Sequence, residues 1–386
     1  MKKILSLLIA GLLLTSLVAC GDKKDADNQE GNTETVVKDY IEDAAKTGKF
    51  KYELNDEGDY EIVNYEANPN LVEEINLVLP TEANGRDIVG IADEVFNGFT
   101  SLKSVTIPAT YEYIGNAAFA GCDKLTTIVI PESITEIGEN AFNGCTALQT
   151  VTLSSKITDI PESAFTNCKA LKTINLANVK TIQSKAFLNC ESLVNVIVSN
   201  KLEYATYDAF RGCTNIAYNK DGGLCYLGDA ANKHVLLVKP ESQNILSCTV
   251  NANTKVIADR AFLDCNDLTS ITLSDSVKVI NGTSFENCEE LQYNVKENGC
   301  YLGTVANPYM ALIKIEMPNI EDFTLNKDTK IITSTAFAEA KKLEDISFGA
   351  LKADWDKIIK AADWTSGIDA NVNVTFSDNS LITIED

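Results

Sequence analysis

Phenylalanine recurs along the chain at a nearly constant interval. It stands at positions 96, 119, 142, 165, 187 and 210, a spacing of 22 or 23 residues, and it returns at 262, 285 and 337. Five residues before each phenylalanine stands an isoleucine, except that Ala205 takes this place once. After most of them come a cysteine and a leucine, as in Phe142, Cys145 and Leu148. A fixed interval of this length predicts a solenoid in which each repeat forms one coil.

Each coil also contains a short alternating segment. In an extended chain, Ile128 and Ile130 place their apolar side chains toward one side, whereas Thr127 and Val129 point to the other. One coil cannot bury such residues alone. Stacked coils bring equivalent residues to about 4.8 Å of each other and enclose a continuous core. The pattern therefore predicts a β-rich solenoid with a parallel strand ladder.

The period is interrupted twice, by intervals of 52 residues after Phe210 and after Phe285. Residues 210–269 align without a gap to residues 285–344, at a shift of 75 residues. Each interval therefore predicts one coil that carries a hairpin-like excursion, and the larger unit is duplicated. We expect one continuous array rather than separate domains.

The segment before the array has the features of an N-terminal cap. Residues 36–44 place apolar side chains at helical spacing, and residues 50–62 alternate on both sides of a turn, which predicts a helix followed by a hairpin. We assign this cap and the first coil to residues 36–95, and the solenoid to residues 96–349.

A second cap is expected at residues 350–386. Residues 351–362 have the spacing of an amphipathic helix, and residues 372–376 alternate as in a closing strand. A solenoid needs such covers over its exposed last coil. Trp355 and Trp364 are interpreted as packing within this cap rather than as ligand-stacking rings.

The first residues are typical of an export signal. Two lysines precede an apolar stretch that is too short for a transmembrane helix, and residues 1–19 are therefore interpreted as a signal peptide. The sequence Leu17-Val18-Ala19-Cys20 resembles the lipobox of bacterial lipoproteins, in which the cysteine carries acyl chains such as palmitate and becomes the new N-terminus. The alternative is an ordinary signal peptide with a chance cysteine. Residues 20–35 hold no large apolar residue after Cys20 and are expected to form a tether.

The repeat itself resembles a known family. The pattern A-F-x-x-C-x-x-L-x-x-I-x-I-P-x-x-[IV]-x-x-I-G-x-x-A-F, which covers about residues 50–350, resembles the bacterial surface proteins called BspA-like. The resemblance implies a leucine-rich-repeat solenoid and a place at the cell surface, with roles in adhesion. The family pattern carries no catalytic residues, so none is transferred to this chain.

Cysteine occupies one repeat position in seven coils. Phe99 or Ala340 replaces it elsewhere, and Cys248 aligns with Phe323, so the position is apolar and we expect buried structural thiols. Disulfides between neighbouring coils are the alternative, since stacked sulfurs would come near bonding range. The seven are Cys122, Cys145, Cys168, Cys190, Cys213, Cys265 and Cys288.

Charge and motifs argue against several kinds of chemistry. The net charge of −22 opposes binding to nucleic acid, whose phosphates would be repelled. His234 is the only histidine and aligns with Tyr309, so we interpret it as a packing residue rather than a catalytic base. No nucleophile elbow or P-loop occurs. We expect no enzyme activity, no cofactor and no metal.

The remaining candidate for function is the exposed side of the strand ladder. Its outward positions are hydroxyl-rich and uncharged until the last coil, where Asp345 appears, and we expect a flat sheet about seven coils long. Threonine also suits strands in general, which is the plain structural explanation. A second candidate is the aromatic part of the excursions, at Tyr226, His234, Tyr301 and Tyr309. The candidate face comprises Thr106, Thr127, Val129, Thr150, Thr152, Thr173, Asn175, Asn195, Ile197 and Thr272.

Three classes of function follow. The first is a lipid-anchored adhesin or interaction module that binds a protein outside the cytoplasm, at the bacterial membrane or cell surface. The second is a glycan-binding component of a nutrient-capture system, which exposed aromatic rings along a groove would support. The third is an enzyme, which would need acids converging on one cleft. The resemblance and the anchor favour the first class.

Overall fold

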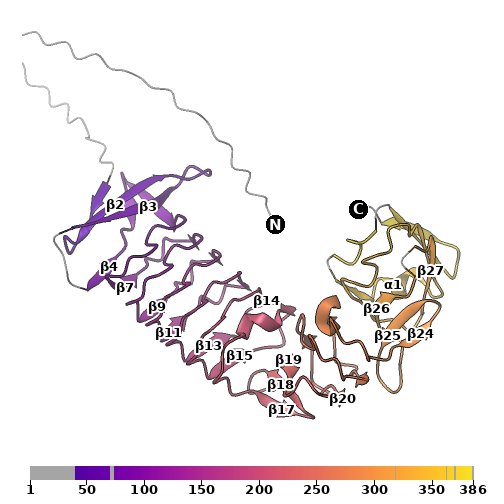
Figure 1. Ribbon diagram of the computed structural model, residues 1–386. Coiled ribbons are helices and arrows are strands. Elements are labelled where there is room, and N and C mark those ends of the chain that lie inside the picture. The colour runs from indigo at the N-terminus through magenta and orange to yellow at the C-terminus, as the bar shows by residue number, and fades with distance from the viewer. Residues whose placement is uncertain (1–39, 70–73, 318, 362, 369–370, 385–386) are drawn as a thin grey trace, which may run out of the picture. The chain divides into compact units, whose positions relative to one another are not determined.

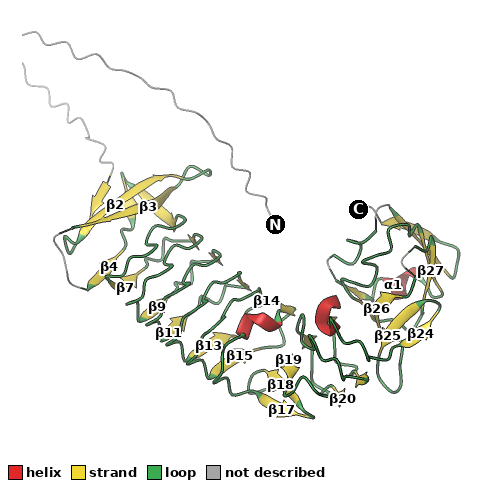
Figure 2. Ribbon diagram, in the orientation of Figure 1, coloured by secondary structure: helices red, strands yellow, loops and turns green. Residues whose placement is uncertain are grey.

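A computed structural model describes residues 40–384, except 70–73, 318, 362 and 369–370. The expected signal peptide, Cys20 and the tether lie outside the described residues. The described chain is a β-solenoid of about 12 turns with repeats of about 23 residues and parallel ladders, as the sequence predicts. Figure 2 shows that only short single turns are helical.

One side of each coil carries a short strand whose apolar residues point inward. In β9, for example, Ile128 is buried between the exposed residues Thr127 and Val129. Successive coils pair these strands in parallel and in register, and Figure 1 shows β9, β11, β13 and β15 following one another. The strands of this side are β4 (Ile75–Val78), β7 (Leu102–Thr106), β9 (Thr127–Val129), β11 (Thr150–Thr152), β13 (Thr173–Leu176), β15 (Asn195–Val198), β20 (Ser247–Thr249), β22 (Ser270–Thr272), β27 (Asp322–Leu325), β29 (Asp345–Phe348) and β31 (Val372–Phe376).

A second parallel ladder is formed by a later segment of each coil, which follows the strand described above. Most of its strands have only two residues, because the chain bends again toward the repeated phenylalanine. The antiparallel strand β5 (Glu82–Ala83) joins its start. The ladder contains β3 (Tyr60–Ala67), β6 (Arg86–Ile91), β8 (Tyr113–Ile114), β10 (Glu136–Ile137), β12 (Asp159–Ile160), β14 (Thr181–Ile182), β16 (Tyr204–Ala205), β21 (Val256–Ile257), β23 (Val279–Ile280), β28 (Ile331–Ile332) and β30 (Ile359–Lys360).

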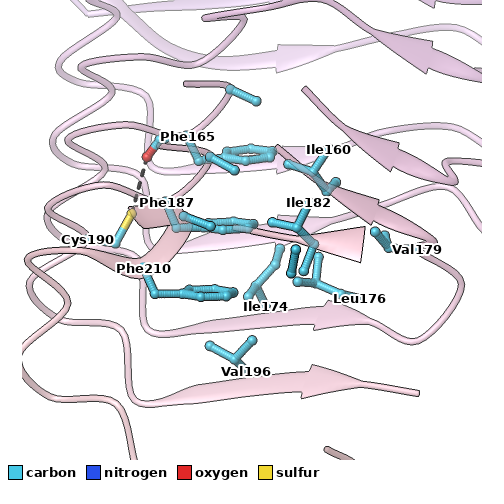
Figure 3. Close-up of a cluster of buried hydrophobic side chains, with 14 of the residues drawn as sticks. Ile160, Phe165, Ile174, Leu176, Val179, Ile182, Phe187, Cys190, Val196 and Phe210 are labelled. Carbon is cyan, nitrogen blue, oxygen red and sulfur yellow. Dashed lines mark hydrogen bonds between the residues drawn. The ribbon is translucent and has the colours of Figure 1, made fainter. Parts of the chain in front are cut away.

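The repeated phenylalanines form a continuous ring stack inside the coils. From Phe96 to Phe210, the centroids of neighbouring rings are 5.0–5.4 Å apart and the ring planes are within 10° of parallel. Figure 3 shows Phe165, Phe187 and Phe210 in this arrangement, with Ile160 and Ile182 beside them. The spacing follows that of the strands, because each ring is fixed to the same position of its coil.

The cysteines of the repeat also stack, and their thiols reach the coil before. The Sγ–H of Cys190 donates to the carbonyl oxygen of Phe165 at 3.2 Å, the dashed contact in Figure 3. The ten cysteines among the described residues are buried and free. The repeat position is thus a buried site, as its exchange with Phe99 and Ala340 predicts. The same bond, at 3.0–3.2 Å, is made by Cys122, Cys145, Cys168, Cys213 and Cys288.

Burial makes most of these thiols unreactive in the folded protein, whereas the neighbouring Cys190 thiol lowers the pKa of Cys213. Burial raises the pKa of Cys122, Cys168 and Cys248 to about 12. At about pH 8 the thiolate fraction is then on the order of one in ten thousand, and only the thiolate is nucleophilic. We expect iodoacetamide to leave the nine thiols other than Cys213 unlabelled in the native state and to label all ten in guanidinium, as counted by mass spectrometry.

An exposed thiol provides the control for that measurement. Ser155 is exposed, and the variant Ser155→Cys should be labelled rapidly at this one position. The outcome that contradicts the interpretation is native labelling of the nine cysteines other than Cys213 as fast as the thiol introduced in this variant.

Each interruption of the period contains a three-stranded antiparallel excursion, as predicted. In the first, β17 (Asn219–Asp221), β18 (Leu224–Leu227) and β19 (Leu236–Pro240) pair in sequence, and β19 then joins the second ladder beside β21. The second repeats this with β24 (Asn294–Lys296), β25 (Gly299–Leu302) and β26 (Ala311–Ile315). A single 3-10 turn precedes each, η1 (Tyr207–Phe210) and η2 (Gly282–Phe285).

The N-terminal cap is a sheet in its described part. The expected hairpin is present, as β2 (Gly48–Leu54) pairs antiparallel with β3. The helix predicted for residues 36–44 is wrong where the chain is described, because β1 (Tyr40–Glu42) is a strand that pairs with β2. The edge of β2 offers backbone hydrogen bonds to a segment too short to form a stable helix.

The C-terminal cap also contains less helix than predicted. Instead of a helix over residues 351–362, the chain forms one turn, α1 (Lys352–Trp355), and then adds β30 to the second ladder. The closing strand β31 is present, and β32 (Leu381–Ile384) pairs antiparallel with it. Trp355 and Trp364 are 3% and 7% exposed, so both rings are cap packing.

Candidate functional site

The strand side of the solenoid presents two lateral rows of outward side chains. Parallel register places Thr127, Thr150, Thr173 and Asn195 in one row. The other row aligns Val129 with Thr152 and Asn175 with Ile197. We call the outward residues of β4, β7, β9, β11, β13, β15, β20 and β22 the strand face. They are Asn76, Val78, Ser104, Thr106, Thr127, Val129, Thr150, Thr152, Thr173, Asn175, Asn195, Ile197, Ser247, Thr249, Ser270 and Thr272.

The strand face is uncharged and partly aliphatic. None of these sixteen residues is charged, although charged residues make up 23% of the chain. The one exposed charged residue of these eight strands is Lys103, at a point in β7 where the pairing with β4 skips a residue. Val78, Val129 and Ile197 expose 56%, 62% and 40% of their surface, and all three lie in the same row. Of the candidate residues, only Thr272 is half-buried, and the other nine are exposed. These three aliphatic side chains alternate with polar residues along the row, as in the mixed surface of a protein interface.

A shallow hollow adjoins the middle of the strand face. The segment from Leu176 to Val179 is one residue shorter than the equivalent segment from Leu153 to Ile157, which accounts for the interval of 22 residues between two phenylalanines. A cavity of about 280 Å³ lies here, lined in part by Thr152 and Asn175. The face is therefore indented where two of its candidate residues meet.

The strand face is not the single flat sheet that the sequence suggests. After β15 the next partner in the ladder is Gly228 of the first excursion, which bridges Ile197. After β22, Gly303 of the second excursion accepts a hydrogen bond from the Leu273 backbone N–H at 2.8 Å. A charge also appears one coil earlier than expected, at Asp322 of β27. The excursions thus divide the ladder into separate sheets.

Gly228 and Gly303 are required because the backbone a few residues later in the chain lies very close to each of them. A Cβ atom on Gly228 would lie 2.0 Å from the carbonyl oxygen of Asn232, and one on Gly303 would lie 2.0 Å from that of Asn307. No side chain fits there, so the chain can turn tightly out of the ladder only with glycine.

The four aromatic candidates in the excursions comprise two buried and two partly exposed residues. Tyr226 and Tyr301 are fully buried, and their hydroxyl groups accept hydrogen bonds from the backbone N–H groups of Asn251 and Asn326. All four residues of β18 and of β25 are buried, so neither tyrosine reaches the surface. His234 and Tyr309 pack edge-on against the buried tyrosines and are partly exposed.

The repeat can now be compared with known proteins. The family model of the BspA type leucine rich repeat region matches the chain in six copies, at residues 89–217, 241–305 and 315–354. These segments are more than half of the chain. The chain belongs to this family. The first excursion lies between two matched segments, at residues 218–240, whereas the match to residues 241–305 includes β24 and β25 of the second excursion.

Solved structures resemble this BspA type chain in fold. No curated protein sequence matches it. Similar structures include a leucine rich cell surface protein from Faecalibacterium prausnitzii, with 20% identity, coverage of 83% of this chain and 97% of that chain, and a TM-score of 0.41. Others are the T. pallidum leucine rich repeat protein, with 24% identity, 65% and 91% coverage and a TM-score of 0.36, and a protein from Bacteroides ovatus, with 18% identity, 85% and 98% coverage and a TM-score of 0.28.

Two further observations apply to the described residues only. Among them, no three or more His, Cys, Asp or Glu side chains are grouped so that they could hold a metal ion. No helix in this part of the BspA type chain is both long enough and apolar enough to cross a membrane.

Proposed function

We propose that this BspA type protein is exported, anchored to the bacterial membrane through lipidated Cys20, and binds a partner protein at the cell surface through its strand face. The observation that carries the proposal is the strand face itself. A chain of net charge −22 keeps sixteen outward positions of eight strands free of charge, with Lys103 of β7 as the exposed exception, and exposes aliphatic side chains among them. Desolvating such a surface costs little, because no charge has to leave water.

A protein partner fits the strand face better than a glycan. Sugars stack on aromatic rings, and none of the outward residues of the strand face is aromatic. Rows of Thr and Asn hydroxyl and amide groups, with valine and isoleucine between them, instead match the mixed surface of a protein. A leucine-rich-repeat solenoid is typically a binding scaffold without catalytic activity, and we extend this to the present chain.

The test adds positive charge to the middle of the strand face. A soluble form that begins at residue 33 is screened against extracellular-matrix proteins and a glycan array, beside a variant with Thr150→Lys, Thr152→Lys and Asn175→Lys. All three residues are exposed, so the fold should persist. We expect the native form to bind a protein and the variant to lose at least about tenfold in affinity, since three desolvated lysines each oppose binding.

A matched variant controls for the added charge. Asn97→Lys, Thr135→Lys and Thr146→Lys add the same three charges at exposed positions outside the strand face, and this variant should bind like the native form. Equal loss in both variants would point to a general effect of charge, and equal binding by both would remove the strand face as the site. Selective capture of a glycan would favour the nutrient-capture alternative.

A further inference from the structure

A deep groove opens where the first excursion separates two coils. It has a volume of about 550 Å³, within the range of ligand sites. One wall is formed by residues 210–214 of the coil that ends the phenylalanine stack, and the opposite wall by residues 260–265 of the next coil. The end of β19, residues 238–241, closes it on a third side. The groove does not include any residue of the strand face.

Beside the groove, the two coils do not form the backbone hydrogen bonds that join other neighbouring coils at the equivalent positions. One coil earlier, the N–H groups of Phe187 and Asn189 donate to the carbonyl oxygens of Ala209 and Arg211, both at 2.8 Å. Across the groove, within the described chain, the Gly212 N–H has no hydrogen-bond acceptor and the Ala261 carbonyl has no donor.

The cysteine of the next coil shows the same separation. The Sγ of Cys265 lies 4.0 Å from the carbonyl of Leu263 in its own coil, whereas the other cysteines of the ladder reach the coil before at 3.0–3.2 Å. Two walls with unpaired backbone groups therefore face an open space.

The groove concentrates positive charge in an acidic protein. The chain has only three arginines, and two of them, Arg211 and Arg260, line the groove together with Lys239. The lining also holds two acids: Glu241 forms an ion pair with Lys220 at 2.6 Å, and Asp264 keeps its charge while it accepts a hydrogen bond from the Asn287 amide at 2.8 Å.

The two arginines differ in their own contacts. Arg260 pairs with Glu286 at 2.9 Å. Among the described residues, the guanidinium of Arg211 has neither an ion-pair partner nor a hydrogen-bond partner. One strong, planar donor is thus free at the rim of the groove.

The duplicated unit shows that this charge is not part of the scaffold. At the shift of 75 residues, Tyr218 and Lys239 recur as Tyr293 and Lys314, and in both copies the lysine lies over the ring, at 5.5 and 4.9 Å from its centroid. The two arginines of the first groove do not recur, whereas Asp264 is replaced by another acid. Arg211, Arg260 and Asp264 correspond to Glu286, Thr335 and Glu339. The fold is therefore built with either set, and the arginines are specific to the first groove.

We propose that the first groove binds an extended acidic peptide segment of a partner protein. The segment adds between the two coils, its backbone accepting from the Gly212 N–H and donating to the Ala261 and Leu263 carbonyls, as in strand addition to a sheet edge. An Asp or Glu side chain of the segment meets Arg211 and Arg260, for which bidentate contact with a carboxylate is the favoured geometry. A sugar acid fits less well, because Lys239 already covers one face of the Tyr218 ring.

The experiment uses the full-length chain and a fluorescently labelled short peptide of alternating Glu and Thr, with binding followed by anisotropy. We expect saturable binding that falls by at least about tenfold in Arg211→Gln, since a charge-assisted hydrogen bond is lost. Lys314→Gln, which removes one positive charge at the position that corresponds to Lys239 in the second excursion, is the control and should bind like the native chain. The triple lysine variant of the strand face should also bind normally, which separates this site from the proposed function.

Three further probes decide between occupants. A Gln-Thr peptide tests the carboxylate, and a Glu-Thr peptide with N-methylated backbone tests the unpaired ladder groups; both should bind at least about tenfold more weakly than the parent. An oligogalacturonate supplies carboxylates without a peptide backbone. Binding of the oligogalacturonate in preference to the peptide would overturn the proposal in favour of an acidic glycan. No saturable peptide binding up to about 1 mM, or equal binding by the Arg211→Gln and native chains, would also overturn it.

Discussion

Replacing Phe165 by alanine should lower the free energy of unfolding by about 3–5 kcal/mol. The ring is fully buried and lies between Phe142 and Phe187, with centroid distances of 5.3 and 5.4 Å and planes within 4° of parallel. Its removal leaves a cavity that the stacked coils cannot close, since each coil is held in place by hydrogen bonds to both neighbours. Guanidinium unfolding followed by circular dichroism measures the loss.

Two matched variants make this expectation specific to the stack. Phe285 has one stacked neighbour, Phe262 at 5.4 Å, and is 6% exposed, so Phe285→Ala should cost less than Phe165→Ala. Val129→Ala removes an outward side chain that is 62% exposed and should change stability by less than about 0.5 kcal/mol. Equal losses for Phe165→Ala and Phe285→Ala would mean that burial of one ring, rather than stacking on two sides, sets the stability.

The parts of the fold that could be predicted are those fixed by repetition. The interval between phenylalanines gives the length of a coil, and one buried position, such as that of Phe142, recurs in most coils, so stacking follows from the sequence. The shift of 75 residues likewise shows that both interruptions are excursions of one kind. The register between coils can also be predicted from the repeat, because each strand pairs with the equivalent strand of the next coil.

The caps show what local periodicity cannot decide. Residues 351–362 have helical spacing, yet Ile359 joins β28 through β30. The open end of a strand ladder offers backbone hydrogen bonds to any nearby segment, and a short helix cannot compete with them. The same reason applies to Tyr40–Glu42, which extends the edge of β2. Neither edge is visible in the sequence of the segment itself.

The candidate sites divide in the same way. The outward residues of the strand face, such as Thr150 and Thr152, follow from alternation within one coil, and they are exposed. The groove beside Arg211 exists because β19 lies between two coils. The resulting separation of these coils cannot be predicted from a local sequence pattern. Two signals in the sequence point toward it: the scarcity of arginine, and the exchange of Arg211 for Glu286 between the duplicated units. Differences between internal copies thus carry information that the shared residues do not.

Replacing Trp355 by alanine should open the C-terminal cap. The ring is 3% exposed and packs edge-on against Phe348, Trp364 and Phe376, with centroid distances of 5.8, 6.0 and 6.3 Å. It therefore links α1 to the last coil and to the closing strand β31. We expect a loss of about 3–5 kcal/mol, of the size found for buried aromatic residues, and a lower melting temperature by circular dichroism.

The cap variant should also associate, which Phe165→Ala should not do while it remains folded. A solenoid that loses its cap exposes the apolar face and the unpaired backbone groups of its last coil, and such edges pair with other chains. Light scattering after size-exclusion chromatography measures the association. Leu351 precedes α1 and is 50% exposed, so Leu351→Ala is the matched control and should stay monodisperse with nearly native stability. A monodisperse Trp355→Ala variant of native stability would show that β31 and β32 close the array without the tryptophan, because they already occupy the edge of the last sheet.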